Sequence, residues 1–147
     1  MSDEPDLEEY TQFLKGLRLR YFSPSEITNY AKSTRNGVRN ALPPEDLWDN
    51  LPPTLWVLDA FRHYIQKPVR LTSIYRSPSY NKSIGSGAAT RSQHLRNCAV
   101  DFQVEGMSPH AAFNQLIRMR KAGCFVGGCG TYSTFTHVDT RGVNATW

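Results

Sequence analysis

The sequence predicts an α+β domain, in which helices flank a small, mostly antiparallel sheet. The chain has 147 residues, which suits a single domain with a hydrophobic core of its own. Apolar residues recur at helical spacing in 54–66, whereas the segments 69–73 and 99–104 read as strands. Helical segments that precede and interrupt such strands are typical of the α+β class.

The N-terminal part of the chain is predicted to be helical. Residues 7–19 begin with acidic side chains and end with basic ones, an order that suits the helix dipole. A second helix should begin at Ser23, because Pro24 suits the first helical turn and Glu26 completes a capping box. We therefore expect two short helices in this region.

The middle of the chain combines an irregular segment, a long helix and a strand. Residues 35–53 hold one glycine and four prolines and are predicted to be irregular, with Trp48 at the edge of the core. The helix over 54–66 ends before Pro68, and the strand over 69–73 follows it. Loops are predicted at residues 77–81 and 85–89.

The C-terminal part supplies the rest of the sheet. After the strand 99–104, a helix should begin at Ser108-Pro109 and end at Ala122, before Gly123. Two short strands are predicted around the glycines at 127, 128 and 130, and the second of them lies within 135–140.

Charge and composition favour an anionic partner and exclude a membrane span. The net charge is +4 at pH 7, and nucleic acid, an anionic cell wall and a membrane surface all suit it, as does a solvated basic face. The sequence has no run of about 18 apolar residues, so no membrane span is expected. Residues 1–6 are acidic and lack the apolar core of a signal peptide, which predicts synthesis in the cytoplasm.

The three cysteines do not form a recognisable metal or redox motif. Cys98, Cys124 and Cys129 cannot all pair with one another, and none lies in a Cys-x-x-Cys sequence. The spacing of Cys124 and Cys129 allows a disulfide or a zinc pair. Buried free thiols are the commoner arrangement.

Two short clusters supply two imidazoles and a carboxylate. His94 and Asp101 are seven positions apart, and His137 lies near the C-terminus. A catalytic zinc ion takes three protein ligands and keeps a fourth position open for water. His94, Asp101 and His137 match that number, and we expect them on one face of the sheet. The histidines at 63 and 110 lie in predicted helices without ligand-like neighbours and are interpreted as structural or solvent-facing.

Asn97 is predicted to form the turn that lets His94 reach Asp101. Side chains alternate along the strand 99–104, and Asp101 points away from the core-facing residues. An odd separation on one straight strand places two side chains on opposite faces, so the chain must turn between them. Asparagine tolerates positive φ better than most residues, and we therefore expect Asn97 in the left-handed conformation.

Asp139 shares a face of the last predicted strand with His137. Three roles fit this position. Asp139 is a general base, or an acceptor that fixes the tautomer of an imidazole, or an ordinary structural acceptor for Arg141 or the backbone. The sequence pattern alone leaves these roles open.

Four motifs resemble one known family. The string Ser-x-His-x-x-Asn-x-Ala-x-Asp at residues 92–101 resembles the Ser-x-His-x-x-Gly-x-Ala-x-Asp signature of the zinc D-alanyl-D-alanine peptidases, with Asn97 in the glycine position. Residues 21–26, 73–81 and 137–142 are similar to further segments of that family, in the same order. The ordered set is more specific than any one motif.

The resemblance implies a zinc enzyme that cuts peptidoglycan stem peptides or cross-bridges, as a carboxypeptidase or an endopeptidase. It implies that His94, Asp101 and His137 bind Zn²⁺. It also implies an N-terminal helical extension, residues 1–20, before a peptidase-like domain, residues 21–147. We expect a monomer. Because the family includes phage lysis enzymes, we expect the protein to act on the cell wall or in the periplasm after its release, either during phage lysis or as part of a virion.

Three further residues are implied to contact substrate. Arg76 carries a planar fork of donors that matches a carboxylate or an oxyanion, and it also suits a structural salt bridge. Ser92 suits a hydrogen bond to substrate or the hydroxyl of a turn. Tyr75 belongs to the same motif as Arg76.

The sequence departs from the family at the catalytic base. Many members place Glu three residues, or His two residues, before the last ligand, where this chain has Thr134 and Phe135. Asp139 or a residue from elsewhere must then act as base, or the chain is a catalytically inactive, zinc-stabilised module that binds the cell wall. A nucleic-acid enzyme of the His-metal type also fits the basic charge. We expect no nucleic-acid partner, because the sequence lacks a coherent basic motif.

Overall fold

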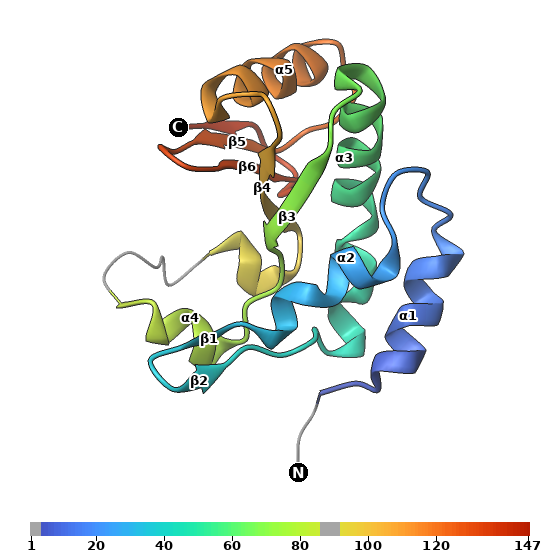
Figure 1. The fold of residues 1–147 in the computed structure, drawn as a ribbon, viewed down its shortest axis with the longest axis vertical. Helices are drawn as coiled ribbons and strands as arrows, with labels where there is room; N and C mark the ends of the chain where they lie inside the picture. Colours follow the sequence, from blue (N-terminus) through green and yellow to red (C-terminus); the bar gives the residue numbers. More distant parts are fainter. Residues whose placement is uncertain (1–3, 86–91) are drawn as a thin grey trace.

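Helices pack around a five-stranded sheet, which confirms the predicted α+β class (Figure 1). The computed structural model describes residues 4–85 and 92–147. Its α-helices are α1 (Leu7–Gly16), α2 (Pro24–Thr28), α3 (Pro52–Ile65), α4 (Pro78–Ser83) and α5 (Pro109–Lys121). Its 3-10 helices are η1 (Asn29–Lys32), η2 (Glu45–Asn50) and η4 (Gln93–Arg96). Its strands are β1 (Thr34–Arg35), β2 (Val38–Arg39), β3 (Val69–Ser73), β4 (Ala99–Val104), β5 (Gly128–Thr131), β6 (Thr136–Asp139) and β7 (Ala145–Thr146).

The sheet has the strand order β3-β4-β6-β5-β7. Its neighbouring strands are antiparallel except β5 and β7, which run parallel. In the β4–β6 pair, Asp101 lies directly opposite His137 and Ala99 lies opposite Asp139. This register brings residues that are far apart in the sequence to one place on the sheet.

The hydrophobic core lies between the sheet and the two long helices. Phe61 of α3 meets Phe102 of β4 edge to face, with ring centroids 5.3 Å apart. Leu116 of α5 and Val100 of β4 are fully buried beside them. Since residues 100 and 102 face this core, the alternation of the strand turns Asp101 to the opposite face.

The predicted starts of α1, α2 and α5 are confirmed. Ser23 and Glu26 form the capping box, with Pro24 in the first turn of α2. The helix α3 begins at Pro52, two residues earlier than predicted, because two prolines fit its first turn. In the predicted N-terminal extension, Tyr10 of α1 is fully buried against Trp48, with ring centroids 5.0 Å apart.

Two loop predictions were wrong. Residues 35–53 are not irregular throughout, because β1 and β2 form a hairpin about Asn36-Gly37, both with positive φ, and η2 follows. Residues 77–81 are not a loop, because Ser77 caps α4 by accepting a hydrogen bond from the Tyr80 N–H. Of the predicted loop 85–89, all but Gly85 lies outside the described residues. Strand β7 was not predicted.

The cysteines are free thiols, so Cys124 and Cys129 do not form the disulfide that their spacing allows. Cys98 and Cys129 are buried, and burial raises the pKa of each thiol to about 11. Cys124 is exposed. No helix within 4–85 or 92–147 combines the length and the apolar character needed to cross a membrane.

Asn97 adopts the predicted left-handed conformation, with φ 60° and ψ 34°. It ends η4 and sends the chain into β4. Its side chain is buried and donates a hydrogen bond to the Leu47 carbonyl at 3.0 Å. The turn between η4 and β4 is therefore fixed by the backbone conformation and by a side-chain bond.

The two contributions of Asn97 can be separated by substitution. Asn97→Gly and Asn97→Ala both lose the bond to Leu47, but only alanine is strained at this φ. We expect the alanine variant to be less stable than the glycine variant by about 1 kcal/mol, after allowance for the freedom of glycine in the unfolded chain. Urea denaturation of both variants measures the difference, and equal stabilities would contradict a strained turn.

Candidate metal centre

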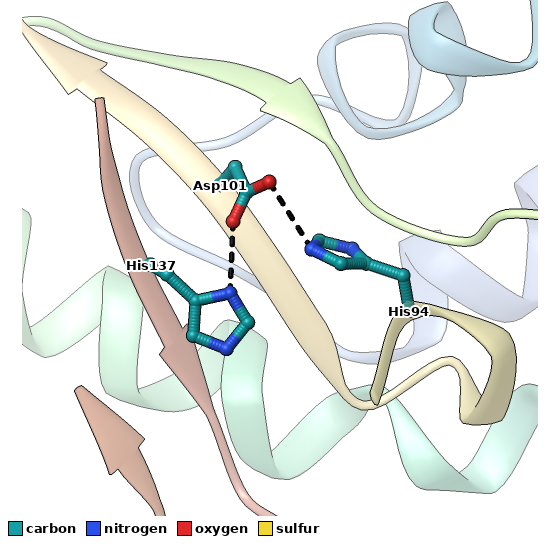
Figure 2. Close-up of side chains that lie close together, drawn as sticks. All are labelled: His94, Asp101 and His137. Carbon is teal, nitrogen blue, oxygen red and sulfur yellow. Dashed lines mark hydrogen bonds and ion pairs between the residues drawn. The ribbon is translucent and has the colours of Figure 1, made fainter. Parts of the chain in front are cut away.

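Three side chains from three elements converge on the face of the sheet away from α3 and α5. Figure 2 shows His94 from η4, Asp101 from β4 and His137 from β6 pointing toward one another. His94 Nε2 lies 3.1 Å from one Asp101 oxygen, and His137 Nδ1 lies 2.9 Å from the other. The structure thus brings together the three residues expected to bind a metal, with donor atoms that all lie within 4.8 Å of one another.

Local structure fixes the direction of the His94 side chain. The left-handed turn at Asn97 folds η4 back beside β4, which carries His94 toward Asp101. The Nδ1 atom of His94 bonds the Ile74 carbonyl at 2.6 Å, so the Nε2 atom is the one that faces the centre. A carbonyl can only accept, which makes His94 Nδ1 the donor and leaves the Nε2 lone pair free for a metal.

The Asp101 carboxylate is buried but ionised, which suits it to bind a cation. His94, Asp101 and His137 are 3%, 4% and 6% exposed. Burial alone would raise the pKa of Asp101, but charge and hydrogen bonds from His94 and His137 outweigh it and hold that pKa below its ordinary value. Asp101 is therefore ionised at neutral pH. Burial would lower the pKa of His137, but its bonds to Asp101 and Asp139 raise it.

Asp139 lies behind His137, on the ring edge away from Asp101. His137 Nε2 is 2.7 Å from Asp139 Oδ2, whereas its Nδ1 atom faces Asp101. Asp139 is fully buried and accepts further bonds from the Gly128 N–H and from the backbone and guanidinium of Arg141. Burial would raise the pKa of Asp139, but these bonds hold it below the ordinary value. Asp139 thus lies where it can orient the His137 ring, and it also accepts structural bonds from Arg141 and the backbone. The role of general base stays a prediction.

A pocket of about 350 Å³ opens over the centre. Besides the three candidate ligands, its described lining residues are Arg76, Ser92, Gln93, Tyr132, Phe135, Arg141 and Trp147. The pocket gives a bound ion the open side that a catalytic site needs. Two imidazole nitrogens and one carboxylate, beside such a space, form a donor set that fits zinc.

The three residues implied to contact substrate lie in different positions. Arg76 lines the pocket, and its Nη2 atom is 3.4 Å from Asp101 Oδ2. Ser92 also lines it, while its hydroxyl accepts a bond from the His94 N–H at 3.2 Å. Tyr75 is 5% exposed and is not among the described residues that line the pocket.

The sequence did not reveal the role of several residues that surround the centre. Arg141 holds Asp139 through two parallel bonds, Nε to Oδ1 at 2.9 Å and Nη2 to Oδ2 at 2.7 Å. Trp147 packs against His137, with ring centroids 4.9 Å apart. Phe135, which stands where a base was expected and cannot act as one, lines the pocket. The sequence pointed to the Arg141 contact in part, because a bond from Arg141 was one of the structural roles considered for Asp139.

Comparison of the sequence with those of known proteins finds relatives of this chain. The chain is 38% identical over 82 residues to the peptidoglycan L,D-endopeptidase MepK of Escherichia coli strain K12. The same values hold for the proteins of that name from Escherichia coli O157:H7 and Shigella flexneri. Each alignment covers 51% of this chain and 41% of the relative. The chain thus spans about two fifths of the length of these relatives.

The family model for peptidase M15 matches residues 20–139. This range includes all three candidate ligands and ends at Asp139. The match confirms the family resemblance seen in the four sequence motifs. The chain belongs to the peptidase M15 family.

Proposed function

We propose that this chain is a zinc-dependent peptidase that hydrolyses peptide bonds in peptidoglycan stem peptides or cross-bridges. The observation that carries the proposal is the convergence of His94, Asp101 and His137 under an open pocket in a peptidase M15 chain. The relatives named as peptidoglycan L,D-endopeptidases support the substrate class. The net charge of +4 suits an anionic wall.

His94, Asp101 and His137 would hold the ion. Zinc bound there would polarise the scissile carbonyl and lower the pKa of an attacking water toward about 7. His94 keeps its orientation because the Ile74 carbonyl accepts its Nδ1–H. His137 keeps its orientation because Asp139 accepts its Nε2–H, so Nδ1 faces the metal position. Asp139 acts in this scheme as a positioning residue.

Arg76 is the proposed cation for the substrate. Its bond to Asp101 is long, at 3.4 Å, and its side chain is 18% exposed toward the pocket. The Asp101 carboxylate would hold the guanidinium less tightly once it also served as a metal ligand. Arg76 is then free to bind a carboxylate of the stem peptide or the oxyanion that develops during attack.

We expect Arg76→Gln to lower kcat/KM by about a hundredfold while the zinc content stays unchanged. The loss of the charged donor removes an interaction with the substrate, not a metal ligand. Arg118→Gln is a suitable control, because Arg118 lies on α5 and, within the described part of the chain, its side chain bonds only Gln115. Steady-state kinetics and metal analysis of both variants test this role, and wild-type kinetics in Arg76→Gln would leave Arg76 a structural ion pair.

A second candidate function is a module that binds the cell wall without cutting it, and the lining of the pocket favours it. Among the described residues that line the pocket, Asp101 is the only carboxylate. A site with a metal ligand set but no separate base also suits a zinc-stabilised module that binds the cell wall without cutting it. The two functions differ in their products, not in their metal content.

Digestion of purified sacculi distinguishes these functions. The zinc-loaded protein is incubated with sacculi, and the soluble products are identified by mass spectrometry, with and without a chelator. A peptidase releases defined peptides or D-alanine, stops with the chelator and resumes after zinc is restored. The products also identify the bond, and hence carboxypeptidase or endopeptidase action. Binding to sacculi without release of products would instead establish the binding module.

A further inference from the structure

Three aromatic side chains that the proposed mechanism does not use lie at the candidate site. Tyr132, Phe135 and Trp147, here called the aromatic wall, line the same pocket as the ligands. The Tyr132 and Phe135 rings stack with centroids 4.3 Å apart. The Trp147 indole lies 4.9 Å from the ring of His137. The wall therefore stands directly beside the position that a metal ion takes in the proposed function.

The main chain fixes Trp147 in this place. Its N–H donates to the Cys129 carbonyl at 3.1 Å, and its carbonyl accepts from the Thr131 N–H at 3.0 Å. The end of the chain consequently lies beside β5 (Figure 1). A Cβ at Gly130 would come within 2.5 Å of the indole, so glycine is needed for the ring to fit. Because the ring is already ordered, binding against it costs little conformational entropy.

The wall offers mainly apolar ring surface. Trp147 Nε1–H donates to the Tyr132 hydroxyl at 2.7 Å, so the indole N–H is already paired. The Arg141 guanidinium lies over the indole, 5.0 Å from the ring centroid. Tyr132 is nevertheless 42% exposed and Trp147 is 41% exposed. Ordered aromatic surface beside a few fixed polar groups is typical of a site that selects a ligand by its apolar part.

We propose that the aromatic wall binds the aliphatic side chain of the substrate residue next to the scissile bond, and that Trp147 makes the site selective for that side chain. This inference rests on the proposed function. It adds Trp147 as a determinant of substrate specificity. Trp147 lies outside residues 20–139, which the family model matches.

The distances decide which part of a substrate reaches the wall. The scissile carbonyl must lie at the metal position, which the His137 ring adjoins. Consecutive Cα atoms are about 3.8 Å apart, so the Trp147 ring, whose centroid is 4.9 Å from that of His137, is reached by the residue next to the scissile bond. Sugar rings of the wall polymer are attached farther along a stem peptide. The occupant is accordingly a side chain of the peptide.

Paired substrates test the selectivity. A synthetic peptide that spans the bond cleaved in sacculi is made with alanine or with glycine next to that bond, and kcat and KM are measured. One buried methyl group corresponds to about a fourfold preference for alanine in kcat/KM. Trp147→Ala should abolish this preference mainly through KM and keep its zinc, whereas Trp147→Phe should retain it. Trp56→Ala is the matched control, since Trp56 is 54% exposed and lines a different groove.

A preference for alanine that persists in Trp147→Ala overturns the inference. So does a loss of zinc in that variant, or an equal fall of kcat for both peptides, because each indicates a structural role. If the wild-type protein cleaves nothing, the proposed function fails. The role of the aromatic wall is then tested separately, by the binding of a peptide. The indole N–H signal of Trp147, assigned by its absence from Trp147→Phe, should shift when acetyl-L-lysyl-D-alanyl-D-alanine is titrated into zinc-loaded protein. An unshifted signal overturns the inference.

Discussion

Asp101→Asn is expected to prevent stoichiometric zinc binding and to lower peptidase activity by more than a hundredfold. The carboxylate is 4% exposed and lies between His94 and His137, and it is the only carboxylate side chain among the described residues that line the pocket. Asparagine preserves the shape but removes the negative charge that draws the cation. Loss of an outer partner of a metal site typically costs 10–100-fold, and loss of a ligand should cost more.

Metal analysis after dialysis and the sacculus assay measure these two effects together. Asp46→Asn is a matched control, because Asp46 is an exposed carboxylate on η2, outside the lining of the metal pocket. The control should bind one zinc per chain and retain full activity. Wild-type zinc content in Asp101→Asn would remove Asp101 from the ligand set.

Asp139→Asn is expected to weaken zinc binding by about 10–100-fold and to lower the free energy of unfolding by about 3–5 kcal/mol. Asp139 is fully buried and accepts bonds from His137, Arg141 and Gly128. An amide cannot balance the guanidinium charge, and the Arg141 side chain would lose a bidentate partner. The His137 ring would also lose the acceptor that fixes its tautomer.

The same variant separates the positioning role of Asp139 from that of a base. At saturating zinc, a positioning role predicts that most of the activity returns, whereas a base role predicts that activity stays lost. Asp59→Asn is the control, because Asp59 accepts bonds from the Arg20 and Tyr21 backbone far from the centre. It should lose some stability and keep the wild-type affinity for zinc. Calorimetric zinc titration and urea denaturation supply both quantities.

The convergence of His94, Asp101 and His137 could be predicted from the sequence because it depends on local rules. Alternation along the strands places Asp101 and His137 on the face away from the core. The turn that adds His94 follows from the odd spacing and from the tolerance of Asn97 for positive φ. Strong cap residues likewise predicted the start of α2.

The surroundings of the ligands depend on contacts between distant residues. Strand β7 has two residues, too few to show a period, and it pairs in parallel with β5, so Trp147 gave no signal. The helix α4 was missed because Ser, Tyr and Asn are weak helix formers, although Ser77 and Pro78 form a recognisable start. The hairpin of β1 and β2 had a signal in Asn36-Gly37 that the prolines nearby obscured.

X-ray absorption of the zinc-loaded wild-type protein tests the central claim most directly. We expect one zinc per chain, surrounded by nitrogen and oxygen atoms at about 2.0–2.1 Å, with the scattering of two imidazoles and no sulfur. Asp101→Asn, loaded in the same way, should lack this signal. Less than stoichiometric zinc in the wild-type protein, or sulfur at about 2.3 Å, would contradict a centre built from His94, Asp101 and His137.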